Sequence, residues 1–416
     1  MKIIHLTDLF SPSIGGMETY ILNLVRERHR RGHDVSVITM SLVGPAGSSV
    51  EDTGYVVHRI GAGYTRMKWA WSNPEHLVHP PFPDPVIALK IQEIIRREKP
   101  DAVQAHNWMA LSYLSVKDET SPPLLWMQHD YSLACPKKTA SYYKGDGICP
   151  NPSLEHCIPC SVDQYGITKG TAITIAQRSS NRTILSRVDK LLANSVQVAT
   201  FDQQVVESGN AIEVVGTLIS DNLEEESLSI PRPDYLPPND DYLLFVGALS
   251  SHKGLPDLLA AYELLGSEAP PLVIFGTPQP HQNFVWPSGA IVRYNVPHDE
   301  VMAAWRHCRI GVVPSRWAEP VGLVALEAGA MGRPIIASRT GGLAEIVIDG
   351  VTGLLFEPGN PADLAAKIKL LHADLDRCNR LGEAGKEQSR SYSATQVTDR
   401  LDKIVEDLVA AKKLRT

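Results

Sequence analysis

Residues 2–39 read KIIHLTDLFSPSIGGMETYILNLVRERHRRGHDVSVIT, and this stretch decides the class of fold. Lys2–Thr7 is a mostly apolar run, which predicts a buried strand. After a glycine turn, Met17–Arg31 carries apolar residues at helical spacing, and Asp34–Thr39 predicts the next strand. This strand–helix–strand order is typical of a parallel sheet covered by helices.

The same alternation resumes after an acidic, proline-rich segment at 221–240, whose composition is typical of an exposed linker. We therefore predict an α/β protein with two Rossmann-like doubly wound domains, 1–220 and 241–395, facing across a ligand-binding cleft. The C-terminal helix 396–416 is expected to pack back on the first domain. Further strands are predicted at Ala102–Ala105, Leu124–Gln128, Lys190–Ala193, Tyr242–Val246, Leu272–Phe275, Ile291–Tyr294, Ile310–Val313, Pro334–Ala337 and Gly353–Phe356.

Length and composition agree with this organisation. A chain of 416 residues exceeds the usual size of one domain, and 43% hydrophobic with 21% charged residues excludes a disordered or coiled-coil protein. The net charge of −7 argues against a general nucleic-acid binder, which needs a positive field. With no apolar run of about 18 residues, no signal peptide and only six cysteines, we expect a cytoplasmic protein.

The strongest candidate for a ligand site is residues 314–328, PSRWAEPVGLVALEA. A helix is expected to begin near Gly322, where free amide groups and the helix dipole favour an anion such as a diphosphate. Glu319 and Glu327 bracket this helix start, about 12 Å apart if the intervening residues are helical. That reach suits the two ends of a nucleotide sugar, because carboxylates accept hydrogen bonds from hydroxyls. The alternative is an ordinary helix start with two solvated glutamates.

Around this stretch the sequence resembles the family 4 retaining glycosyltransferases, which have the GT-B fold. The first half contributes SPSIGGME at 11–18 and RGHDV at 31–35 to the resemblance. The second half contributes 314–357, including GRPIIA at 332–337, GGLAEIV at 341–347 and DGVTGLL at 349–355. Because matching motifs occur in both halves, the resemblance spans nearly the whole chain. It implies transfer of a sugar from a nucleotide-diphosphate sugar, UDP- or GDP-linked, to a hydroxyl acceptor with the anomeric configuration retained.

The resemblance also implies roles for individual residues. Glu327 corresponds to the carboxylate that binds the donor ribose, and Glu319 to the one that holds the transferred sugar. His129 corresponds to a histidine that contacts the sugar, although a lone histidine at a strand end is otherwise more often structural. Lys253 would meet the leaving diphosphate, so His129, Glu319 and Lys253 are the catalytic candidates. Backbone groups of four residues would approach the sugar and phosphates, namely Gly16, Gly322, Leu323 and Val324.

One position departs from the family pattern. Family members commonly have Gly-Arg-Leu, three residues and Lys-Gly, whereas residues 247–254 here read GALSSHKG. Ala248 therefore replaces a guanidinium that would hold the diphosphate in a bidentate manner. Neutralisation of the diphosphate would fall to Lys253, with His252 or another basic residue as a candidate for compensation.

The resemblance implies that the chemistry needs no cofactor or divalent metal. It also implies that no second catalytic carboxylate pair is needed, because the leaving phosphate itself would take the acceptor proton. Glycan, glycolipid and glycoconjugate synthesis are all compatible with this reading, with a sugar, lipid-linked or small-molecule acceptor. Two alternatives are a nucleotide-sugar epimerase on the same scaffold and a degenerate nucleotide-binding protein without transfer activity, to which Ala248 points. The sequence does not decide the donor base, the sugar, the acceptor or the oligomeric state.

Four of the six cysteines lie within 26 residues: Cys135, Cys149, Cys157 and Cys160. The spacing of Cys157 and Cys160 suits a turn that chelates tetrahedral zinc. Cys135 and Cys149 do not form a second such turn, so a structural zinc ion, an iron–sulfur cluster and free or disulfide-paired thiols all remain open. Since this loop follows His129, we expect it to shape the acceptor side of the site.

Two basic segments are candidates for peripheral contact with anionic lipid at the inner membrane face, and the second is also a candidate for binding a sugar acceptor. Their alternative readings are an ordinary complement to a helix dipole and buried packing. The first segment is a helix end with Arg26, Arg28, Arg30 and Arg31. The second is an aromatic loop with Tyr64, Arg66, Lys68, Trp69 and Trp71.

Overall fold

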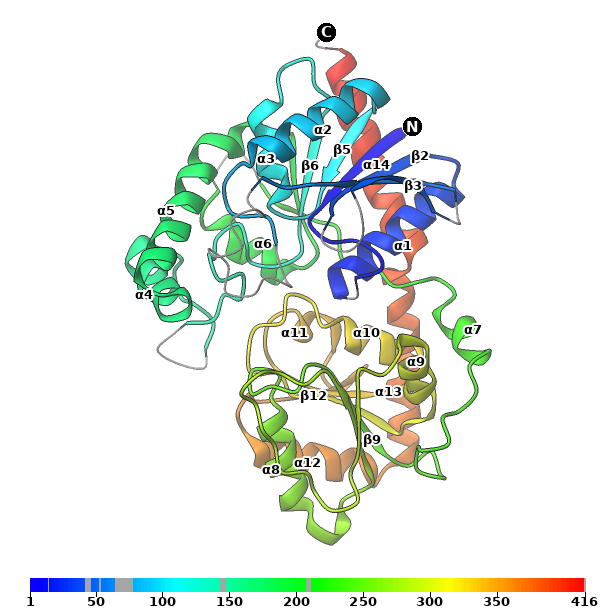
Figure 1. Ribbon diagram of the computed structural model, residues 1–416. Helices are drawn as coiled ribbons and strands as arrows, with labels where there is room; N and C mark the ends of the chain where they lie inside the picture. Colours follow the sequence, from blue (N-terminus) through cyan, green and yellow to red (C-terminus); the bar gives the residue numbers. More distant parts are fainter. Residues whose placement is uncertain are drawn as a thin grey trace. The chain divides into compact units, whose positions relative to one another are not determined.

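The computed structural model of the chain describes residues 1–13, 15–41, 46–51, 54–63, 78–142, 147–206 and 211–414. The chain divides into two compact units, each built around its own sheet (Figure 1). The first unit comprises Met1–Lys144, Cys149–Leu218 and Val397–Thr416, and the second is formed mainly by Ile219–Gln396.

The sheet of the first unit has the strand order β3-β4-β2-β1-β5-β6-β7-β8. All neighbouring strands in it are parallel except β3 and β4, which are antiparallel. The strands are β1 (Lys2–Thr7), β2 (Asp34–Met40), β3 (Gly47–Val50), β4 (Val56–Ile60), β5 (Ala102–Ala105), β6 (Leu124–Gln128), β7 (Lys190–Ala193) and β8 (Glu213–Val214).

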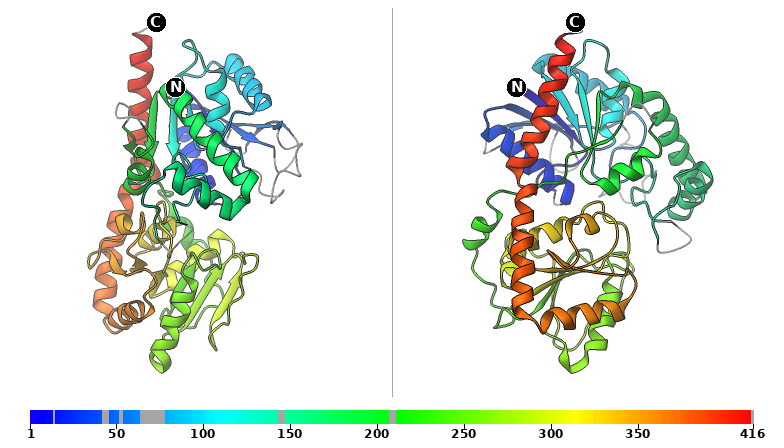
Figure 2. Two further views of the ribbon diagram at one scale, coloured as in Figure 1. Left: turned by 90° about the vertical axis from the view of Figure 1, so that its left-hand side faces the viewer. Right: turned by 180° about the vertical axis from the view of Figure 1, so that it is seen from behind.

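Helices cover both faces of this sheet, with α2 and α3 over one face and α14 over the other (Figures 1 and 2). Covering both faces explains why the central strands are apolar throughout, as in β1, where Ile3, Ile4 and Leu6 are completely buried. The helices of this unit are α1 (Gly16–Arg30), α2 (Pro85–Glu98), α3 (Met109–Val116), α4 (Leu154–Tyr165), α5 (Ile167–Ile184), α6 (Val196–Gln203) and most of α14 (Ala394–Lys413).

The sheet of the second unit has the order β11-β10-β9-β12-β13-β14, and all its neighbouring strands are parallel. Its strands are β9 (Leu243–Val246), β10 (Leu272–Gly276), β11 (Ile291–Tyr294), β12 (Ile310–Val313), β13 (Ile335–Ser338) and β14 (Gly353–Phe356). Its helices are α7 (Leu223–Leu228), α8 (Leu255–Leu265), α9 (His298–His307), α10 (Leu323–Ala330), α11 (Leu343–Ile346), α12 (Pro361–His372) and α13 (Leu375–Ser389).

Side chains of the second sheet alternate between two cores, because successive residues of a strand point to opposite faces. In β9, Leu244 packs with α9, α10 and α11, whereas Leu243 and Phe245 pack with α8, α12 and α13. The segment expected as a linker contributes to the first of these cores through the buried side chains of Leu223 and Leu236. The predicted fold class, two Rossmann-like doubly wound α/β domains, is confirmed.

The strands predicted from the sequence are found within one residue at each end. Three strands of the first unit, β3, β4 and β8, were not predicted. In β4, polar His58 and Arg59 interrupt the apolar run, and the buried His58 bonds to Ser48 (Nδ1–Oγ 2.7 Å) and Glu98 (Nε2–Oε1 2.5 Å).

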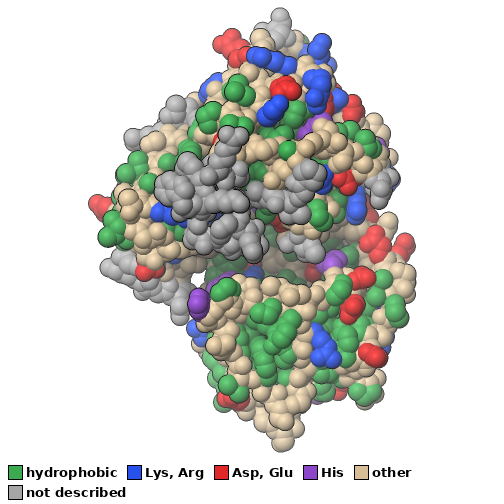
Figure 3. All heavy atoms as spheres, in the orientation of Figure 1, with side chains coloured by type: hydrophobic (Ala, Val, Ile, Leu, Met, Phe, Trp, Pro, Cys, Tyr) green, Lys and Arg blue, Asp and Glu red, His purple; other side chains and the backbone are tan. Residues whose placement is uncertain are grey.

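No helix among the described residues is both long enough and apolar enough to cross a membrane. On the face drawn in Figure 3, basic, acidic and apolar side chains are interspersed on both units. The charge on that face is therefore mixed.

Candidate functional site

The centre of the candidate site is an ion pair between Lys253, just before α8, and Glu319, in the loop between β12 and α10. Lys253 Nζ lies 2.6 Å from Glu319 Oε1, which also accepts a hydrogen bond from Ser315 Oγ at 2.6 Å. Glu319 is buried, with 7% of its surface exposed. Burial acts to raise the pKa of this carboxyl, but the Lys253 charge and the bonds from Lys253 and Ser315 hold it below its ordinary value. Glu319 is thus a buried, ionised carboxylate.

Backbone packing brings the two loops of this ion pair together. His252 O accepts the amide of Arg316 at 2.9 Å, and the Arg316 guanidinium makes a bidentate bond to the buried carboxylate of Asp257 in α8. Gly254 has φ +72°, and a Cβ at this position would lie 1.6 Å from Pro314 O. Only glycine therefore allows the loop of Lys253 to approach the loop of Glu319 this closely.

The loop that carries Glu319 packs on the turn between β13 and α11. The amide of Gly342 donates to Glu319 O at 2.7 Å. Gly341 has φ +52°, and a Cβ there would lie 2.4 Å from the same oxygen. The GGLAEIV motif is thus the support that fixes the backbone of Glu319.

The helix that follows this loop, α10, begins after Gly322, whose φ of +91° turns the chain into the helix. The first amides of a helix have no partner within it, so the groups around Gly322, Leu323 and Val324 are donors for an anion. Glu327, on the next turn of α10, is 8% exposed and accepts a hydrogen bond from His298 Nε2 at 3.1 Å. This bond with Glu327 raises the pKa of His298 above its ordinary value.

His252 does not supply the positive charge that the family arginine would bring at position 248. Burial, together with the neighbouring Lys253 charge, lowers the pKa of His252, so its imidazole is neutral at pH 7. Arg316, the nearby guanidinium, is engaged by Asp257. Lys253 pairs with Glu319 through a single contact, whereas Arg316 is held by two hydrogen bonds to Asp257.

The first unit holds the other two predicted site residues. Gly16 is the first residue of α1, one position earlier than the predicted helix start. His129 follows β6, its Nε2 lies 2.9 Å from His106 Nδ1, and the Tyr20 ring packs edge-on against it at 4.6 Å. Burial lowers the pKa of His129 to about 3, so the ring is neutral.

The cysteines Cys135, Cys149, Cys157 and Cys160 line one small pocket of the first unit together with His156. As they lie, they do not fit a metal ion, because the described residues contain no group of three or more His, Cys, Asp or Glu arranged to hold one. The guanidinium of Arg178 also donates to Cys157 Sγ at 3.4 Å, so this sulfur is already engaged within the protein. The sequence expectation of zinc is therefore not supported by this arrangement.

The basic end of α1 makes contacts within the protein. Arg28 is completely buried, and Arg30 and Arg31 both bond to Glu27. Of these arginines Arg26 and Arg30 are exposed. The aromatic loop at 64–71 lies outside the described residues.

Comparisons with protein families identify the class of protein. A family described as "Glycosyltransferase Family 4" matches residues 14–215, and one described as "Glycosyl transferases group 1" matches residues 230–388. The two matches together cover most of both units. The chain belongs to the family 4 glycosyltransferases, it has their GT-B architecture, and it is a glycosyltransferase enzyme.

Individual relatives show the same class. The chain is 33% identical over 243 residues to the uncharacterized glycosyltransferase MJ1178 of Methanocaldococcus jannaschii, across 52% of this chain and 65% of that protein. It is 25% identical to the D-inositol 3-phosphate glycosyltransferase of Corynebacterium glutamicum, across 99% and 96% of the two chains. Among solved structures, Anabaena Alr3699/HepE in complex with UDP and glucose has a TM-score of 0.67 at 16% identity, covering 98% and 99%.

Sequence reasoning did not identify three residues that shape the site. Ser315 lies within the quoted motif, four residues before the carboxylate to which it donates. His298 and His106 lie in no motif, and their contacts with Glu327 and His129 depend on the fold.

Proposed function

We propose that the protein is a retaining glycosyltransferase that moves a sugar from a UDP- or GDP-sugar to a hydroxyl acceptor. The observation that carries the proposal is the buried Glu319–Lys253 pair beside the start of α10. A buried carboxylate beside a lysine and free helix amides offers acceptors for sugar hydroxyls and donors for a diphosphate within one loop cluster. The UDP and glucose bound by the similar Anabaena protein support a donor of this kind.

In the proposed reaction, Glu319 accepts hydrogen bonds from hydroxyls of the transferred sugar, and Glu327 accepts them from the donor ribose. Lys253 turns from Glu319 toward the leaving diphosphate and, with the amides of α10, stabilises the charge that grows there. The bond between the anomeric carbon and the diphosphate breaks while the acceptor oxygen attacks from the same face. The leaving phosphate takes the proton of the acceptor hydroxyl, so no further protein base is required.

The acceptor is proposed by chemical class. The relative from Corynebacterium glutamicum is named for D-inositol 3-phosphate, so phosphorylated polyols are the first acceptors to test. Loss of the second cation at Ala248 leaves diphosphate binding to Lys253 and the helix start, which predicts weaker nucleotide binding than in relatives that keep the arginine.

The test is a thermal-unfolding screen with UDP, GDP, ADP and dTDP. A nucleotide at about 100 times its dissociation constant stabilises the native protein by about 2.7 kcal/mol, which raises the midpoint by several degrees. We expect a shift with one nucleotide that Glu327→Ala abolishes and that Glu263→Ala, which changes an exposed glutamate of α8, leaves intact. Absence of a shift with all four would contradict the proposed donor site.

A further inference from the structure

Three histidines of the first unit form a hydrogen-bonded series across neighbouring strands. His5 lies in β1, His106 follows β5 and His129 follows β6, and these strands are adjacent in the sheet. His5 Nδ1 lies 2.9 Å from His106 Nε2, and His106 Nδ1 lies 2.9 Å from His129 Nε2. The rings also stack, with centroids 5.2 Å apart in each pair. Each imidazole thus uses both of its nitrogens except His129, whose Nδ1 has no partner among the described residues.

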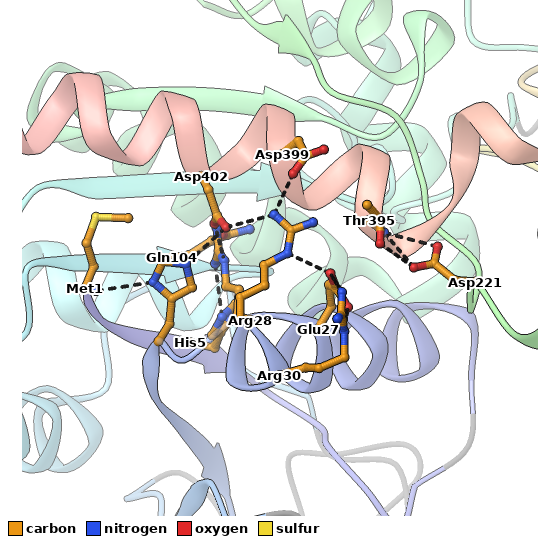
Figure 4. A network of polar contacts seen from close by, with 12 residues as sticks. Met1, His5, Glu27, Arg28, Arg30, Gln104, Asp221, Thr395, Asp399 and Asp402 are labelled. Carbon is orange, nitrogen blue, oxygen red and sulfur yellow. Dashed lines mark hydrogen bonds and ion pairs between the residues drawn. The ribbon is translucent and has the colours of Figure 1, made fainter.

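The inner end of the series is the fully buried guanidinium of Arg28 (Figure 4). Arg28 Nη1 contacts His5 Nε2 at 3.2 Å and donates to Gln104 Oε1 at 2.7 Å. Its Nε donates to Asp402 Oδ1 of α14 at 2.8 Å. Figure 4 shows Arg28 between α1 and α14, with His5 and Gln104 beside it. Bonds on three sides therefore fix the orientation of the guanidinium.

Arg28 gives the series a direction. A guanidinium in a protein stays protonated and only donates, so His5 Nε2 must accept. A neutral imidazole has one N–H, so His5 donates through Nδ1 to His106 Nε2, and His106 donates through Nδ1 to His129 Nε2. Burial, with the nearby Arg28 charge, holds the pKa values of His5 and His106 well below their ordinary range, so both rings are neutral.

We propose that Arg28, His5 and His106 are positioning residues that hold His129 as the neutral tautomer protonated at Nδ1. His129 then presents a fixed N–H donor to an oxygen of the bound sugar and has no acceptor nitrogen left to offer. The identity of the bound sugar rests on the proposed function, whereas the tautomer rests on the hydrogen-bonded series alone.

The direct test is nitrogen-15 NMR of the imidazoles in the full chain labelled at histidine, at neutral pH. Comparison with His129→Gln assigns the His129 signals. We expect a protonated Nδ1 and an unprotonated Nε2 at His129 in the wild type. His106→Leu removes the donor, so a mixture of tautomers is expected. His106→Asn, whose amide can donate from nearly the position of Nδ1, should restore the Nδ1-protonated form.

A matched control is His79→Leu, because His79 is also buried and bonded at both ring nitrogens but lies outside the series. We expect this variant to leave the His129 tautomer unchanged, which separates general loss of stability from loss of the series. Once the donor is known, His106→Leu should raise KM about three- to tenfold, the effect of one hydrogen bond, with recovery in His106→Asn.

The proposal is overturned if wild-type His129 is protonated at Nε2, or if His106→Leu leaves the tautomer unchanged. Neither result depends on activity. A Nδ1-protonated His129 in a protein that binds no nucleotide would refute the proposed function alone, and nucleotide binding with a Nε2-protonated His129 would refute this proposal alone.

Discussion

The ion pair at the centre of the site makes a quantitative prediction for stability. Lys253 Nζ and Glu319 Oε1 are 2.6 Å apart, and the two side chains are 23% and 9% exposed. With an effective dielectric constant of about 20, the gross attraction at this distance is about 6 kcal/mol. Much of it is offset by desolvation, and removal of one partner of a fully buried pair costs about 3–5 kcal/mol. Because Lys253 is partly exposed, we expect Lys253→Met to cost about 2–3 kcal/mol.

Glu319→Gln should cost less, about 1 kcal/mol, because Lys253 can turn toward solvent and the amide oxygen still accepts from Ser315. In the double variant neither charge is left unpaired, so its loss should fall short of the sum by about 1–2 kcal/mol. The exposed pair of Lys369 and Glu268 in the same unit is the matched control, and it should show no measurable coupling.

The assay is urea unfolding, monitored through hydrogen-exchange mass spectrometry of peptides from β9 and β12. These strands belong to the second unit, so the method reads its unfolding separately from that of the first unit. Additivity of the two single variants within about 0.3 kcal/mol would show that the two groups do not interact in solution.

Three further predictions concern other parts of the molecule. Gly341→Ala should lower the free energy of unfolding by about 2–4 kcal/mol and weaken nucleotide binding, because it combines a positive φ with a Cβ 2.4 Å from Glu319 O. The control Gly350→Ala, at φ +76° with open space around the Cβ, should lower it less in the same urea assay. Burial acts to raise the pKa of Glu98, but bonds from His58 and Ser36 and the Lys2 charge lower it to about 2. The stabilisation from the ionised Glu98 is present above the unfolded pKa and is lost as the pH falls from about 4.5 through 2. Glu98→Gln should therefore weaken the pH dependence of the first unit's stability in this range, measured by hydrogen exchange of β2 peptides. Mass spectrometry of the purified protein should find less than one zinc per chain, and one tightly bound zinc would show that the four cysteines rearrange around it.

The sequence predicted the parallel strands well because both faces of each sheet are covered, which leaves long apolar runs to read. The missed strand β4 has polar residues whose burial depends on partners, as His58 depends on Glu98 forty residues later. The edge strand β8 has only two residues, too few to show a pattern.

Site residues were predicted one by one, through the family resemblance, but their mutual contacts were not. Lys253 and Glu319 lie 66 residues apart in the sequence, and their ion pair depends on the approach that Gly254 permits. The histidine series depends on strand register, since His5 meets His106 only because β1 and β5 pair with His5 opposite Gln104. Such contacts follow from long-range pairing, which local patterns do not contain.

Retaining transfer by this protein can be tested through the anomeric configuration of the product. The protein is incubated with the nucleotide sugar identified by the unfolding screen and a phosphorylated polyol, and the new glycosidic bond is examined by proton NMR. We predict a transferred sugar with the same anomeric configuration as in the donor, and loss of transfer in Glu319→Ala. Inversion at the anomeric carbon, or conversion of the donor to another nucleotide sugar without transfer, would contradict a retaining glycosyltransferase.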